Sequence, residues 1–63
     1  MRVWLKKIRE DLKLTLEEAA ERCGISKSYF EKIEYGDRNV PVKTAMQIAT
    51  ALGFDWQIFY KEA

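Results

Sequence analysis

Apolar side chains recur along this chain at intervals of three and four residues, the spacing of one face of an α-helix. Leu5, Ile8 and Leu12 show this spacing near the N-terminus. No stretch of four or more residues alternates strictly enough to require a β-strand. The pattern therefore predicts an all-α fold of five helices, over residues 2–13, 16–23, 27–35 and 42–52, with a short fifth helix after Asp55.

Residues that begin and end helices stand at the boundaries of these segments. Thr15 is followed three residues later by Glu18, which is the pattern of a capping box, and Ser26 precedes the next segment as an N-cap. Glycine favours the left-handed C-cap because it has no Cβ, and each predicted helix from the second to the fourth is followed by one: Gly24, Gly36 and Gly53.

The second and third predicted helices are joined by a turn of only three residues, 24–26. Such a connection makes two helices cross steeply, at about 90–120°. Ala20 is small enough to permit the close crossing, and Phe30 and Ile33 would anchor the second helix of the pair inward. This spacing is a helix-turn-helix signature.

On the helix over residues 27–35, the side chains away from the anchors are polar. A helix of this diameter fits the major groove of DNA, where lysine can donate to guanine, serine can bond to several bases and glutamate can accept from cytosine. The sequence therefore predicts base contacts by Lys27, Ser28, Glu31 and Lys32. Tyr35 lies on the same face.

Composition narrows the functional classes. With 63 residues the chain forms one domain at most, 1–63, and one cysteine with no histidine excludes an internal disulfide, the usual four-ligand zinc site and histidine-dependent catalysis. We expect no enzyme activity, metal or cofactor. No apolar run reaches the length of a membrane span, and no signal-peptide core is present, so the expected location is the cytoplasm.

Net charge is only +1, but it is unevenly distributed. Residues 2–13 carry five basic and two acidic side chains, hence +3, and residues 14–25 sum to −2. A nearly neutral chain can still present a positive face to a polyanion, because the local field decides the attraction.

The segments Leu14–Ser26, Ser28–Gly36 and Ala45–Gly53 together resemble the phage-repressor/Cro-like helix-turn-helix family, also called the xenobiotic-response-element type. The resemblance implies a compact, lambda-repressor-like, five-helix DNA-binding domain of a bacterial or phage transcriptional regulator, usually dimeric. It also implies phosphate contacts by Thr15, Arg38, Asn39 and Lys43, to which Ser26 and Tyr35 are added as candidates. Leu16 departs from the family, which often has a glutamine there that binds a phosphate.

Three further interpretations concern packing. Arg9 and Glu34 each flank an apolar stripe, and in similar proteins this pair forms a structural ion pair. Cys23 is expected in the core, with a redox switch as the alternative. The tail holds large apolar residues that cannot all face one small core, so a dimer interface is expected there, with core packing as the alternative: Trp56, Ile58, Phe59 and Tyr60.

The sequence thus predicts a cytoplasmic, nucleoid-associated homodimer that binds a double-stranded DNA operator as a transcriptional repressor. The alternative is a protein-interaction module of the antitoxin or anti-repressor type with the same fold. The near-neutral charge and the apolar tail favour this alternative.

Overall fold

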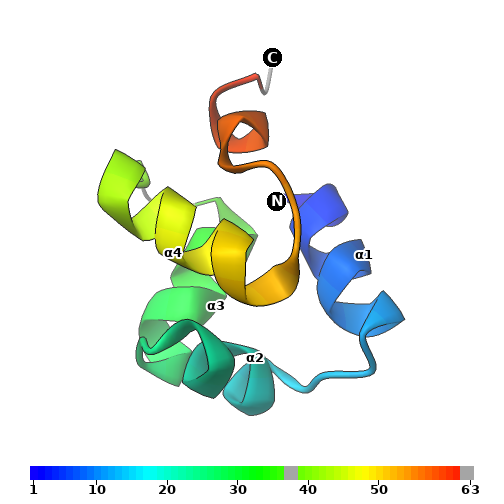
Figure 1. Cartoon of the computed structure of the whole chain (residues 1–63). Coiled ribbons are helices and arrows are strands. Elements are labelled where there is room, and N and C mark those ends of the chain that lie inside the picture. Colours follow the sequence, from blue (N-terminus) through cyan, green and yellow to red (C-terminus); the bar gives the residue numbers. More distant parts are fainter. Residues whose placement is uncertain (37–38, 62–63) are drawn as a thin grey trace.

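All the regular secondary structure in the part of the chain that the computed structural model describes, residues 1–36 and 39–61, is helical. Four α-helices and a final 3-10 helix follow one another along the chain (Figure 1): α1 (Val3–Asp11), α2 (Leu16–Cys23), α3 (Lys27–Tyr35), α4 (Val42–Leu52) and η1 (Trp56–Tyr60). The all-α prediction is confirmed for these residues. The short fifth helix predicted after Asp55 is present as a 3-10 helix and not as an α-helix, with an Ile58 N–H to Asp55 C=O bond of 3.1 Å.

The predicted caps form. The Thr15 hydroxyl accepts the Glu18 N–H at 3.1 Å, and the Glu18 carboxylate accepts the Thr15 N–H at 2.9 Å, so the capping box is complete. These hydrogen bonds lower the pKa of Glu18, and their contribution to stability is therefore lost as the pH falls through that lowered value. Ser26 caps α3 by accepting the Tyr29 N–H at 3.1 Å. The left-handed backbone predicted for the three glycines is confirmed.

Helix α1 is shorter than predicted at both ends. It begins at Val3 and ends at Asp11, because Lys13 adopts a left-handed φ of 60° and turns the chain toward Thr15. Arg9 stabilises this turn through both its backbone and its side chain. Its carbonyl accepts the Leu14 N–H at 3.1 Å, and its Nη1 donates to the Leu14 carbonyl at 3.0 Å.

The core is formed where α2 and α4 pack with α3 and the N-terminal helix (Figure 1). Its buried apolar residues are Leu5, Ala19, Ala20, Cys23, Phe30, Ile33, Val40, Ala45, Ile48, Leu52 and Phe59. The helical period of the sequence predicts that α4 buries one apolar arc, formed by Val42, Ala45, Met46, Ile48, Ala49 and Leu52, and this arc is too wide. Val42 and Met46 remain 50% and 46% exposed, since the core takes only the narrower stripe of Ala45, Ile48, Ala49 and Leu52.

The structure supports core packing for one tail residue, Phe59, and leaves the predicted dimer interface at the other three as a prediction. The Phe59 ring is 4% exposed and packs edge-on against Trp4, with ring centres 5.0 Å apart. A ring already buried in the protomer offers no surface to a second copy, so the predicted interface is corrected at Phe59. Trp56 and Ile58 are half-buried, and Tyr60 is 49% exposed while its hydroxyl donates to the Val40 carbonyl.

The predicted ion pair between α1 and α3 is present. Arg9 Nε and Nη2 donate to the two carboxylate oxygens of Glu34 at 2.9 and 3.1 Å. Both side chains are largely removed from water, with exposed fractions of 11% and 6%. The hydrogen bond to the Glu34 side chain raises the pKa of Arg9. The two-pronged geometry fixes the rotation of α3 relative to α1.

We expect Arg9→Met to lower the free energy of unfolding by about 3 kcal/mol, because it leaves the Glu34 carboxylate buried without its partner. The double variant Arg9→Met/Glu34→Leu should regain most of this loss, since it removes both buried charges. Urea titrations of the three proteins measure the difference. A single variant as stable as the wild type would contradict this interpretation of the pair.

Candidate nucleic-acid interface

Helix α3 presents a polar face to solvent because its apolar residues are fully used by the core. Phe30 and Ile33 are 0% exposed. Lys27, Ser28 and Lys32 are exposed, whereas Glu31 is half-buried at the side of the same face. The four predicted base-contacting residues therefore lie on one nine-residue helix. Three of these four are exposed, and two of those three are cations.

The turn before α3 sets the direction of this face. Gly24 has a φ of 72°, and the Ile25 N–H reaches back to the Ala20 carbonyl at 3.0 Å, which closes α2 in a single tight turn. Ala20 is 2% exposed, so nothing larger than a methyl group separates the two helices at their crossing. The polar side of α3 is consequently turned away from the body of the domain.

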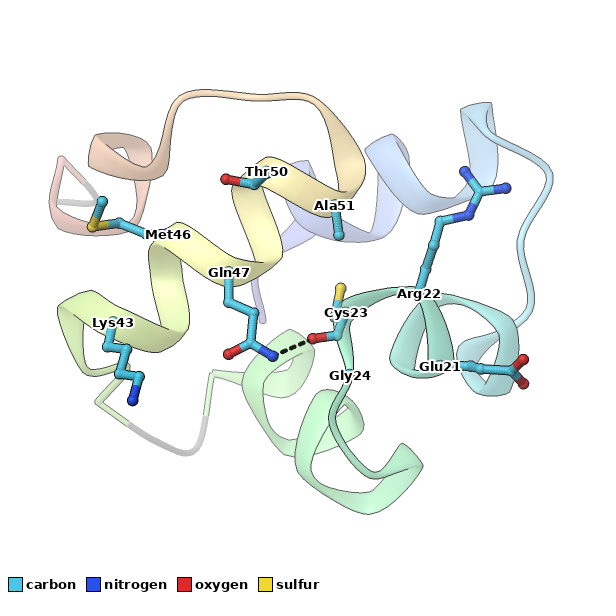
Figure 2. Close-up of a pocket in the computed structure, with 9 residues that line it drawn as sticks. All are labelled: Glu21, Arg22, Cys23, Gly24, Lys43, Met46, Gln47, Thr50 and Ala51. Carbon is cyan, nitrogen blue, oxygen red and sulfur yellow. Dashed lines mark hydrogen bonds between the residues drawn. The ribbon is translucent and has the colours of Figure 1, made fainter.

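A side chain of α4 holds the same turn from behind. Gln47 Nε2 donates to the Cys23 carbonyl, as the dashed line in Figure 2 shows. A Cβ at position 24 would lie 3.1 Å from that nitrogen, so a larger residue would crowd the Gln47 amide in addition to straining the φ of 72°. The helical period puts Gln47 on the side of α4 opposite the apolar arc, so the sequence predicts an outward side chain and misses this contact. Only the small residue at position 24 hinted that another group comes close.

The predicted phosphate-contacting residues that the structure describes are all exposed: Thr15, Ser26, Tyr35, Asn39 and Lys43. Arg38 lies outside the described residues. Lys43 lies one turn before Gln47 on α4 and lines the same groove as Gly24, which places a cation near the helix-turn-helix corner (Figure 2).

The helix N-termini differ in electrostatic character. A helix N-terminus attracts anions through its free N–H groups and its dipole. The first turn of α2 carries Glu17 and Glu18, which oppose a phosphate near Thr15. The first turns of α3 and α4 hold no acidic residue and contain Lys27 and Lys43. At the starts of α3 and α4 the lysine charge and the helix dipole therefore have the same sign. Leu16 is half-buried against the core, so the position where the family often has a glutamine contributes packing.

An open groove of about 630 Å³ lies between the C-terminal half of α2 and α4 (Figure 2). Cys23 is at its base and only 2% exposed, and burial raises the pKa of this thiol to about 11. A thiol that stays protonated near neutral pH is a poor nucleophile, which favours the expected core role over the redox switch.

Two kinds of site are absent from the described part of the chain. Among residues 1–36 and 39–61, no three histidine, cysteine, aspartate or glutamate side chains lie close enough to hold a metal ion. No helix there is long and apolar enough to cross a membrane.

Comparison with known proteins agrees with this geometry. A helix-turn-helix family model, HTH_3, matches residues 5–59, and the chain belongs to this family of non-enzymatic, XRE/Cro-like transcriptional regulators. It is 42% identical over 62 residues to the uncharacterized HTH-type transcriptional regulator YqaF of Bacillus subtilis (strain 168), covering 98% of this chain and 82% of that protein.

A solved structure is also similar. The crystal structure of an HTH_3 family transcriptional regulator from Vibrio cholerae superimposes with a TM-score of 0.77 at 30% identity, covering 89% of this chain. The match covers 32% of that protein, so this chain corresponds to about a third of its length. The compact lambda-repressor-like fold is thus established, with four α-helices and a 3-10 turn within residues 1–36 and 39–61.

We expect Cys23 in the native protein to react with a thiol reagent at pH 8 far more slowly than in urea, because it is both buried and protonated. The raised pKa also predicts a loss of stability between about pH 9 and 11, since the unfolded thiol ionises first. Labelling rates and urea titrations measure both effects. Cys23→Ala is the control, because it has no thiol to ionise. Its free energy of unfolding should fall less between about pH 9 and 11 than that of the wild type. An equal fall in the two proteins would contradict the raised pKa of Cys23.

Proposed function

We propose that this chain is a sequence-specific, double-stranded DNA-binding regulator that inserts α3 into the major groove and represses transcription by occupying its operator. The observation that carries the proposal is the outward face of α3, where Lys27, Ser28 and Lys32 are exposed above fully buried anchors. Family membership supports DNA binding. The sequence specificity, the major-groove binding mode and the repressor role are our inference.

The roles follow from the chemistry of each side chain. Lys27 and Ser28 lie in the first turn of α3, the part of this motif that approaches base edges. Lys32 lies one turn further on, where an ammonium group can donate to guanine N7 and O6. Glu31 accepts from cytosine N4 or excludes other bases. Asn39, Lys43 and the cap Ser26 would contact phosphates on either side, with Tyr35 at the far end of α3. The Thr15 hydroxyl would reach a phosphate only against the repulsion of Glu17 and Glu18.

A homodimer is proposed because one protomer is too small to bind two successive major-groove segments. The domain measures 26 × 20 × 20 Å, whereas successive segments on one side of DNA are about 34 Å apart. The second copy would bind on exposed apolar residues of α4 and η1, namely Val42, Met46 and Tyr60. Tyr60 is tied to this region by its bond to the Val40 carbonyl. Trp56 and Ile58 would contribute their exposed portions.

Titration of a labelled duplex at several salt concentrations tests the proposal, using duplexes selected from a random pool. A dimer that neutralises about six phosphates should give a slope of log K against log salt near −5. Failure to enrich any sequence, or an affinity that does not respond to salt, would overturn it. Retention of a partner protein in the absence of DNA would then favour the interaction-module alternative.

Lys32→Ala should weaken binding to the selected duplex by about 1–3 kcal/mol and relax preference at one base pair, because the variant loses a base-edge donor. The matched control is Lys7→Ala, which removes an exposed cation from α1. It should weaken binding slightly and equally on all sequences. An equal loss on all sequences for Lys32→Ala would assign that lysine to phosphate instead.

Met46→Glu should raise the dimer dissociation constant by about tenfold or more, because it places a charge within the proposed apolar interface. The control is Leu12→Glu, another exposed apolar residue, 41% exposed, at the end of α1. Sedimentation equilibrium measures the two variants. Equal effects, or none, would contradict the assignment of the second copy to this surface.

A further inference from the structure

Residues at the start of the chain hold the last turn of α3. The Arg2 backbone N–H donates to the Glu34 carbonyl at 2.8 Å, and Arg2 Nη1 donates to the Ile33 carbonyl at 2.6 Å. Both carbonyls belong to the C-terminal turn of a helix, where few backbone N–H donors remain. Arg2 therefore donates to the Glu34 carbonyl, and adds a second donor at the Ile33 carbonyl beside the Gly36 N–H.

The α3 terminus is arranged to receive this contact. Its C-cap, Gly36, has a φ of 83°, and its own N–H bonds to the Lys32 and Ile33 carbonyls, both at 3.1 Å. A Cβ at position 36 would lie 3.6 Å from the Met1 nitrogen and 4.0 Å from Arg2 Nη1. The first two residues thus lie directly against the end of the helix. A cation there also complements the helix dipole.

The Arg2 guanidinium, which donates to the end of α3, also contacts an aromatic ring of the core. Its carbon lies 5.5 Å from the centre of the Phe59 ring, within the range of a cation–π interaction. Phe59 is buried against Trp4 and cannot shift freely. A planar guanidinium can stack on a ring while it donates in its plane, whereas an ammonium group does this poorly. The position of Arg2 is consequently fixed by the core.

We propose that Arg2 is a positioning residue of the DNA interface, which fixes the C-terminal turn of the recognition helix against the core and so sets the reach of Lys32. This inference rests on the proposed function. The first turn of α3 is held independently by the Gly24 corner and the Ser26 cap. The last turn is held by Arg9 at the Glu34 side chain and by Arg2 at two carbonyls.

The two ends of α3 should therefore respond differently to the loss of Arg2. Base pairs read by Lys27 and Ser28 should keep their preference, because the start of the helix stays in place. The base pair read by Lys32, one residue before the first carbonyl that Arg2 binds, should lose preference. A purely structural role would lower stability without this selective change.

Arg2→Met tests the proposal, with Lys7→Met as a control of equal charge change on α1. For each protein, affinities are measured at one salt concentration on the selected duplex and on duplexes altered at single base pairs. Arg2→Met should reduce discrimination by about tenfold at the base pair that Lys32→Ala identifies, and at no other. Lys7→Met should leave all discrimination ratios unchanged. Arg2→Lys should show an intermediate loss, and it replaces Arg2→Met if that variant does not fold.

Unchanged discrimination in the Arg2 variants, or an equal loss on every duplex, would overturn the proposal. A wild-type chain that binds no duplex would overturn the proposed function instead. Amide hydrogen exchange without DNA then tests the anchoring separately. Faster exchange at Gly36 in Arg2→Met than in Lys7→Met would support it, and equal rates would overturn it.

Discussion

The close crossing of α2 and α3 is the constraint on which the rest of the structure depends. A three-residue connection leaves no room for side-chain bulk between the two helices, so Ala20 and Gly24 stand where they approach. Once the crossing is fixed, Phe30 and Ile33 can only point into the core, and the polar side of α3 can only point out. Solvent exposure of the candidate base contacts is therefore a geometric consequence of small residues elsewhere.

This explains how much the sequence could predict. Helix positions, caps and C-terminal glycines are local properties, and Thr15, Ser26 and Gly24 each behave as their local pattern indicates. The Arg9–Glu34 pair was predicted because similar proteins have it. The outward face of α3 was predictable because two strong anchors define the opposite side. In each of these cases the signal lies within a few residues or in a family pattern.

The contacts that sequence reasoning missed join residues far apart in the chain. Gln47 bonds to the Cys23 carbonyl, 24 residues away, and Arg2 bonds to the Ile33 carbonyl, 31 residues away. Every residue has a backbone carbonyl, so the residue type does not indicate which carbonyl accepts a distant side chain. The exposure of Val42 and Met46 was missed for a related reason. Periodicity gives the direction of an apolar stripe, but the neighbouring elements decide its width.

Electrostatics then explains how a nearly neutral chain can suit a polyanion. Acidic residues are concentrated at the start of α2, whereas the first turns of α3 and α4 contain lysines and no acids. Helix dipoles add positive potential at these same two ends. Arg2 and Arg9, although cationic, are bonded within the protein to the far end of α3 and are committed to its placement. Two of the five basic residues in the N-terminal segment therefore help to place the helix that carries the lysines, and net charge is a poor guide to that structural role.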